Sequence, residues 1–269
     1  MSIKQTLKHF LRKLFRSILQ PILSENNEIL LRKQMRLITT AQLHKNTFAK
    51  FKACNRGKNV VIIGAGPTVS QFKPIDNSIY IGLNRACQLD NVNFSYLFSI
   101  DKIGIEHIYP QFAKYECVKF IGDQNLGPKW QIPETEVVKM KGDVYRYKTD
   151  AGLYQESFFT YDIDSQPLGN FNTVSLQAMQ FALYTLPEKI YLVGIDCSDY
   201  GHFAARQNEE LSLDKRIQER GESRTQNASN SIRYWQMLKI FADEYYPEVK
   251  IVSVNPVGLR GIFEDLDQL

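Results

Sequence analysis

A run of apolar residues followed at once by a glycine-rich turn constrains this chain more than any other feature. Asn59-Val60-Val61-Ile62-Ile63 reads as a buried β-strand, and Gly64-Ala65-Gly66-Pro67-Thr68 follows it as a turn that opens a helix. A strand that leads through a tight glycine turn into a helix is the first half of a strand–helix–strand unit. This arrangement predicts an α/β fold.

Further strands and helices are expected along the rest of the chain. The pattern predicts strands at 79–83, near 94–100, around 117–121, at 189–194 and at 249–254, and helices at 173–186 and 232–246. Because strands alternate with helices, we expect a Rossmann-like, doubly wound and mostly parallel sheet. The expected layout is a helical extension over 1–50 and a catalytic domain over 51–269, in which 122–168 is a site-building insertion and 204–228 a lid.

The charge balance and the cysteines exclude several classes of protein. A net charge of +4 with unevenly placed basic residues argues against a nucleic-acid partner. The four cysteines stand singly, without a CxxC pair, which argues against a zinc site or a disulfide framework and indicates a reducing cytoplasm. We expect a bacterial protein. No secretory signal and no apolar stretch of membrane-spanning length is readable.

Residues 1–24 carry only basic charges, and their apolar residues recur at helical spacing. This segment predicts either a helix lying on an anionic membrane surface, or one packing on its own domain or on a second subunit in a homo-oligomer. The first alternative would place the protein at the inner face of the cytoplasmic membrane.

The turn after the first strand is a candidate phosphate site. Gly64 and Gly66 allow the backbone to approach a ligand, and the following helix would offer free amides to an anion. Pro67 suits the first turn of that helix, and the Thr68 hydroxyl can cap it or bind a phosphate oxygen. The third glycine of the dinucleotide fingerprint and the Gly-Lys-Ser/Thr of a Walker loop are both missing.

Polar residues follow three of the expected strands. Asn84, Asp101 and Asp196 each stand just beyond a strand end. Ligands of open α/β sheets bind outside the carboxyl ends of the strands, so we expect these three side chains to converge on one cleft. Each could instead cap a loop.

Two further segments carry polar residues that fit such a cleft. Asn172, Thr173 and Ser175 begin a helix, where they serve as caps or provide a second anion site. After the strand at 189–194, Asp196 and Asp199 could hold magnesium, and His202 could act as a general base.

These motifs together resemble glycosyltransferase family 42 sialyltransferases. The resemblance rests on Val60–Thr68, on Asn84 and on Lys189-Ile-Tyr-Leu-Val-Gly-Ile-Asp196, and it covers roughly 58–203 with the final helix and strand. It extends to a wider superfamily that includes motility-associated flagellin glycosyltransferases and archaeal-type hydroxymethylpterin diphosphokinases.

The resemblance implies a Rossmann-like domain that binds a CMP-linked sialic acid or related nonulosonic acid without metal. It implies that the donor site is formed by the glycine loop, in which Gly64, Gly66, Pro67 and Thr68 match the family and Ala65 lies between the glycines. The other expected donor-site residues are Asn84, the helix start at Asn172, Thr173 and Ser175, and the strand end at Gly194 and Asp196. Asp101 falls where the sialyltransferases carry an asparagine, and we expect Asp101 and His202 to be the catalytic pair.

The chain departs from the family at two points. Ala65 replaces an asparagine of the glycine loop, and 227–231 lacks the histidine that the family places before its last long helix. His202, which lies earlier, is the only nearby histidine.

We therefore expect an inverting glycosyltransferase of cell-surface polysaccharide synthesis. It would move a sugar from a nucleotide donor to a glycan or lipid-linked acceptor, without a cofactor. A magnesium-dependent phosphoryl or diphosphoryl transferase that uses Asp196 and Asp199 is one alternative, and a non-catalytic nucleotide-sugar-binding scaffold is another.

Overall fold

A computed structural model describes most of the chain. The described residues are 25–100, 102, 104–123, 131–151, 153–154, 156–203, 205, 210, 214–215, 217–219 and 221–267. Two predictions, the amphipathic helix of 1–24 and the role of Asp101, lie outside them.

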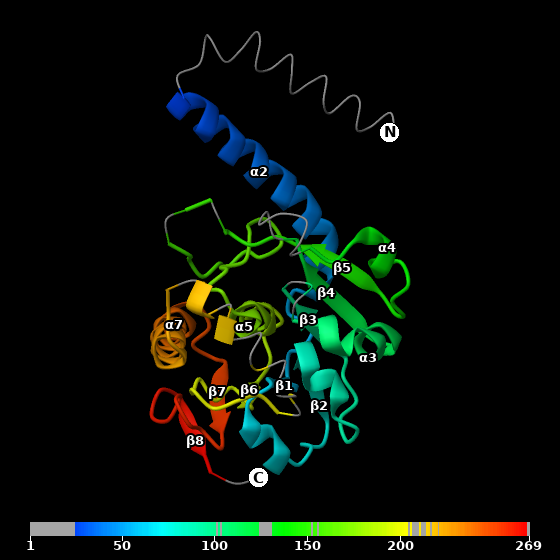
Figure 1. Cartoon of the computed structure of the whole chain (residues 1–269), viewed down its shortest axis with the longest axis vertical. Helices are drawn as coiled ribbons and strands as arrows, with labels where there is room; N and C mark the ends of the chain where they lie inside the picture. The colour runs from blue at the N-terminus through cyan, green and yellow to red at the C-terminus, as the bar shows by residue number, and fades with distance from the viewer. Residues whose placement is uncertain are drawn as a thin grey trace.

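The described residues form a single layered α/β unit (Figure 1). Its strands are β1 (Asn59–Ile63), β2 (Ser78–Leu83), β3 (Tyr96–Ser99), β4 (Val118–Gly122), β5 (Val144–Tyr147), β6 (Lys189–Val193), β7 (Lys250–Val254) and β8 (Glu264–Leu266). Its α-helices are α2 (Glu25–Phe48), α3 (Tyr109–Lys114), α4 (Glu134–Val137), α5 (Val174–Tyr184) and α7 (Arg224–Tyr245). Short 3₁₀ helices are η2 (Ala49–Phe51), η3 (Pro67–Gln71), η4 (Asn84–Gln88) and η5 (Glu106–Ile108).

The strands pair in parallel in the order β5-β4-β3-β2-β1-β6-β7-β8. At the centre of the sheet, Val61 of β1 lies level with Tyr80 of β2 and Tyr191 of β6. The order runs outward in opposite directions from β1, so the sheet is doubly wound and its topological switch point falls between β1 and β6. The predicted Rossmann-like fold class is confirmed.

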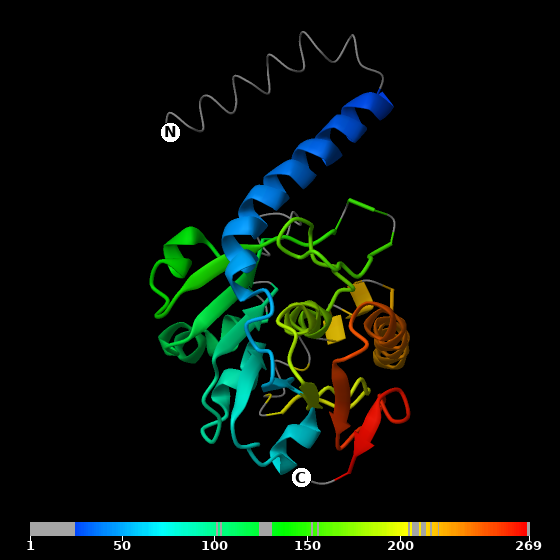
Figure 2. The same cartoon turned by 180° about the vertical axis from the view of Figure 1, so that it is seen from behind.

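Each face of the sheet carries its own hydrophobic core, because successive strand residues point to opposite faces. Val60 and Ile62 of β1 belong to the core beneath α5, α7 and the end of α2. Val61 and Ile63 belong to the core on the side of α3 and α4. Figure 2 shows α5 and α7 side by side over one face of the sheet.

Helix α2 has two different halves. Its N-terminal half extends away from the body of the protein (Figures 1 and 2). The exposed apolar side chains along α2 are Ile29, Leu30, Met35 and Ile38. Its last turns bury His44, Thr47 and Phe48, and Phe48 stacks on Phe120 of β4 with ring centroids 5.4 Å apart. Phe48 of α2 and Phe51 of η2 therefore belong to the same hydrophobic core. Within the described residues, none of the helices is long and apolar enough to cross a membrane.

Several elements differ from the sequence-based expectation. The helix expected after the glycine turn is the short 3₁₀ segment η3, and the last helix begins eight residues earlier than predicted, at Arg224. The segment 122–168, in which no strand was predicted, supplies the parallel edge strand β5. β8, at the other edge, is also absent from the prediction. Of the predicted lid, 224–228 is the start of α7.

Candidate site at the switch point

The turns that follow β1 and β6 pack directly on one another at the switch point. The Gly64 amide donates to Val193 O at 2.8 Å, and the Gly66 amide donates to Gly194 O at 2.8 Å. These bonds extend the pairing of the two strands beyond their carboxyl ends. Two loops far apart in sequence therefore form one edge of the candidate site.

The glycines of the first turn are required by this packing. A Cβ at Gly64 would overlap Gly194 O, and a Cβ at Gly66 would overlap the Asp196 carboxylate. Gly194 has a φ of +62°, a left-handed conformation that favours glycine. The sequence-based interpretation, in which the glycines let the backbone approach a ligand, has to be revised: they let one turn approach the other.

Asp196 is tied to the glycine turn. Its carboxylate accepts a bond from the Thr68 amide at 3.1 Å and another from the Thr68 hydroxyl. The Asp196 side chain is buried, and burial raises its pKa against the effect of the two bonds. The Thr68 hydroxyl, predicted as a phosphate ligand, is therefore directed at a carboxylate.

Few amides of the turn remain for an anion. Those of Gly64, Gly66, Thr68 and Val69 donate to the internal acceptors, and Pro67 has none. Only the Ala65 amide of this turn has no acceptor within the described part of the chain. The expected grip by successive amides of residues 64–68 is thus not present in this conformation.

The segment around His202 joins the loops after β1, β2 and β6. The Phe203 amide donates to Ala65 O at 2.7 Å, and Arg85 Nη1 donates to Phe203 O at 3.3 Å. Arg85 lies next to Asn84 at the end of β2. His202 therefore stands one residue from a direct bond to the glycine turn. The sequence alone placed His202 only in the segment after β6.

Asn84 follows β2 at the same edge with an unusual geometry. Its φ is +46°, a left-handed conformation that asparagine tolerates better than most residues. Its Oδ1 is buried and has no hydrogen-bond partner among the described residues. A Cβ at Gly104 would overlap the Asn84 amide, so Gly104 leaves room for this side chain. A buried acceptor without a partner is costly and fits a role in binding a donor group.

The start of α5 is built from strained backbone and a cap. Thr173 is the N-cap: its Oγ1 accepts from the Ser175 amide at 3.4 Å and lies 2.9 Å from Ser175 Oγ. Phe171 and Asn172 have φ values of +43° and +54°. Asn172 is exposed and accepts a bond from Asn170 Nδ2 at 3.0 Å. The C-terminal end of α5 lies beside the residues that precede β1, where the Asn55 amide donates to Thr185 O at 3.0 Å. Because α5 runs from there across β1, β2 and β3, its start lies toward the carboxyl edge of the sheet.

Buried Asp150 anchors the segment that leads to α5. It accepts bonds from the Ser157 hydroxyl at 3.0 Å and from the amides of Phe158 and Asn170 at 3.0 and 2.8 Å. Sequence reasoning missed this residue, because a single aspartate in a segment without periodicity carries no signal of such contacts.

Three charged residues around His202 were also missed. Arg85 is described above, and Glu210 contacts both the backbone and the ring of His202. Arg224, at the start of α7, binds Glu210. Only the helix start could have been found, since Ser223 and Gln226 have the spacing of a capping box, which the structure contains.

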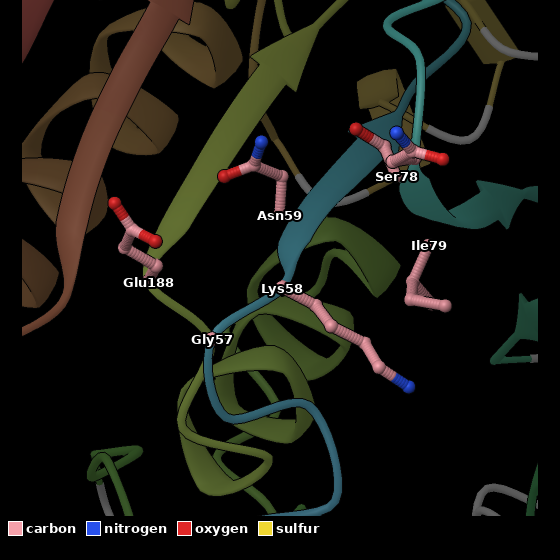
Figure 3. A pocket seen from close by; sticks show the side chains of 7 residues that line it. Gly57, Lys58, Asn59, Ser78, Ile79 and Glu188 are labelled. Atoms are coloured by element: carbon pink, nitrogen blue, oxygen red, sulfur yellow. The ribbon is translucent and has the colours of Figure 1, made fainter.

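The described residues form cavities elsewhere. One of about 510 Å³ opens at the amino-terminal ends of β1 and β2, where Lys58 and Glu188 extend in opposite directions (Figure 3). Another of about 270 Å³ lies beside the start of α7, around Glu222 and Asn230. In a ligand-binding site, the polar side chains point toward a common position. Lys58 and Glu188 of the first cavity do not do so, whereas the carboxyl edge of the sheet brings together polar groups from four elements.

The two predicted magnesium ligands differ in their surroundings. Asp196 is buried against Thr68, whereas Asp199 is exposed. No group of three or more histidine, cysteine, aspartate or glutamate side chains is placed to hold a metal ion in the described ranges.

Fold and site together define a doubly wound, parallel α/β protein with a polar site at its switch point.

No family model matches the chain, and no curated protein matches its sequence. Its structure is similar to those of sialyltransferases from Campylobacter jejuni. CstII in complex with the substrate analogue CMP-3FNeuAc is 16% identical with a TM-score of 0.43, over 73% of this chain and 80% of that one. The monofunctional alpha-2,3-sialyltransferase Cst-I is 15% identical with a TM-score of 0.43, over 73% and 75%. At these values the likeness assigns no function.

Proposed function

We propose that this protein is a glycosyltransferase that binds a nucleotide-activated sugar at the carboxyl edge of β1, β2 and β6. The observation that carries the proposal is the direct bonding of the loops after these strands. Phe203 bonds to Ala65 and Arg85, so that His202 and the unpartnered Oδ1 of Asn84 are held at one edge. Ligands of open α/β sheets bind at such a switch point.

The resemblance of Val60–Thr68 and Lys189–Asp196 to family 42 sialyltransferases supports a CMP-linked nonulosonic acid as the donor. In the reaction, the oxygen of an acceptor hydroxyl attacks the anomeric carbon of the sugar. The bond from that carbon to the phosphate oxygen breaks, and CMP leaves with the bonding electrons. His202 takes the hydroxyl proton. The acceptor is a surface glycan or its lipid-linked precursor.

The leaving phosphate needs positive charge or hydrogen-bond donors. Because the glycine turn uses most of its amides internally, we assign this role to the Ala65 amide, the Arg85 guanidinium and the first turn of α5. Asn84 Oδ1 accepts a hydrogen bond from the nucleotide.

A thermal-shift panel of CMP, CDP, UDP, GDP and ATP tests the donor site. We expect a selective rise of Tm with CMP, because a ligand that binds only the folded state stabilises it. CMP-sialic acid should then be hydrolysed slowly, and transferred faster once an acceptor sugar is present. A panel without any response would contradict the proposal.

Two asparagines at opposite ends of β2 provide matched variants. Asn84 and Asn77 both have a positive φ, +46° and +55°, and glycine accepts that conformation at either position. Asn84→Gly removes the amide at the carboxyl edge and should abolish the CMP response. Asn77→Gly changes the lining of the amino-terminal cavity and should preserve the response. The reverse result would move the ligand site to that cavity.

A further inference from the structure

His202 is held by a single carboxylate oxygen. Glu210 Oε1 accepts a bond from the His202 amide at 2.8 Å, and the ring Nδ1 of His202 lies 3.1 Å from the same oxygen. A Cβ at Gly201 would lie 3.3 Å from the Glu210 carboxyl carbon, so a glycine here allows the close approach. His202 therefore contacts this carboxylate with both its imidazole ring and its backbone amide.

The second oxygen of Glu210 is bound to α7. Arg224 Nη2 donates to Glu210 Oε2 at 2.9 Å, and Arg224 Nε donates to Asp214. Glu210 is 20% exposed and Arg224 25%, so the pair is only partly screened by water. Arg224 is the first residue of α7, whose N-cap Ser223 is secured by a capping box. The carboxylate therefore has a rigid support on the side away from His202.

This arrangement determines which ring nitrogen carries the proton. An ionised carboxylate only accepts hydrogen bonds, so Nδ1 of His202 must donate, and in the neutral ring Nε2 keeps the lone pair. The charged groups facing His202 are Glu210, Arg85 from η4 and Arg224 from α7. Partial burial lowers the pKa of His202 and is the largest effect. The Glu210 carboxylate raises this pKa, whereas Arg85 and Arg224 lower it further, so the pKa of His202 lies below its ordinary value. At neutral pH the ring is therefore an unprotonated base.

We propose that Glu210, braced by Arg224, is the positioning residue that holds His202 as the Nδ1–H tautomer with Nε2 available as the base. That Nε2 takes its proton from an acceptor hydroxyl rests on the proposed function. The tautomer itself is a property of the free protein. In a purely structural ion-pair network, Glu210 would connect α7 to the loop after β6 without controlling the ring.

Asp214 offers a matched control, because it binds the same arginine without contacting His202. Nitrogen-15 NMR of the full-length protein, labelled at its four histidines, reports both tautomer and titration. We expect the Nδ1–H form of His202 in the unsubstituted protein. In Glu210→Gln that preference should weaken and the pKa of His202 should fall, because the carboxylate that raises it is gone. Asp214→Asn should leave the tautomer unchanged.

The turnover of the donor provides a second measurement. In Glu210→Gln we expect kcat to fall by about 10-fold to 100-fold with KM little changed, since the base is mispositioned and the donor contacts remain. Asp214→Asn should stay close to the unsubstituted rate. If both variants affect the His202 signals equally, Glu210 has no specific control over the ring and the inference is wrong.

The unsubstituted protein alone gives a decisive result if Glu210→Gln does not fold. An Nε2–H tautomer of His202 would overturn the inference without any variant. These spectra are recorded without a donor, so their outcome is independent of the nucleotide panel. A confirmed tautomer with no CMP response would contradict the proposed function and leave the Glu210–His202 assignment intact.

Discussion

Acidification perturbs a buried histidine that joins α2 to the segment before α5. His44 is inaccessible to solvent: its Nδ1 lies 2.8 Å from the carbonyl oxygens of both Ile163 and Gln166, and its Nε2 accepts the Lys148 amide at 2.7 Å. Because carbonyls only accept and an amide only donates, Nδ1 carries the proton and Nε2 must stay unprotonated. Burial lowers the pKa of His44 to about 4, against the opposing effect of the two carbonyls.

The size of the effect follows from the two states. In the unfolded chain the pKa of His44 returns to about 6.5. As the pH falls from about 6.5 to about 4, the unfolded chain binds a proton that the folded protein does not, so folding stability is lost across this window and no further below it. A difference of roughly 2.5 pH units corresponds to about 3.4 kcal/mol in total, of which about 2 kcal/mol is lost by pH 5.

Urea unfolding near pH 7.5 and near pH 5 measures this loss. Other groups titrate equally in the protein and in His44→Gln, so the difference between the two isolates His44. Near pH 7.5 the variant should be less stable, and by about pH 5 the gap should narrow by about 2 kcal/mol. His107→Gln, at an exposed position in η5, serves as the control. Parallel losses in the protein and in His44→Gln would refute the reasoning.

Three further predictions concern the packing that supports the site. Gly66→Ala should lower the free energy of unfolding by about 1–3 kcal/mol in chemical denaturation without any ligand, because its Cβ would overlap Asp196; unchanged stability would show that the turns can separate. Phe48→Ala should cost about 3–5 kcal/mol, since the ring is fully buried in the core, whereas a loss near zero would make α2 a detachable extension. Ser223→Ala should cost about 1 kcal/mol by removing the α7 capping box, seen as a lower Tm, and an unchanged Tm would contradict this.

The central strands could be predicted from the sequence because burial on both faces requires long apolar runs. The strand at 59–63 and the strand predicted at 189–194, observed at 189–193, needed no information from the rest of the chain. The edge strands were different. β5 and β8 have mixed or polar composition, and they are strands because β4 and β7 offer them unpaired backbone groups.

The start of the final helix shows a similar limit. The apolar periodicity of 232–246 predicted the helix, but its first turns are polar and become helical through the Ser223 cap and the Arg224 ion pairs. Local patterning carries no information about an arginine whose partners lie 10 and 14 residues earlier in a polar segment.

The sequence by itself determined the doubly wound class and the residue types at the strand ends, because both depend on local hydrophobic order and on the chain sequence of strands and turns. Only the tertiary structure decided what those residues contact. Gly64, Gly66 and Thr68 read locally as a phosphate turn, yet they pack against Gly194 and Asp196, about 130 residues away. The register between β1 and β6 sets this contact, and such a register exists only once the sheet has formed.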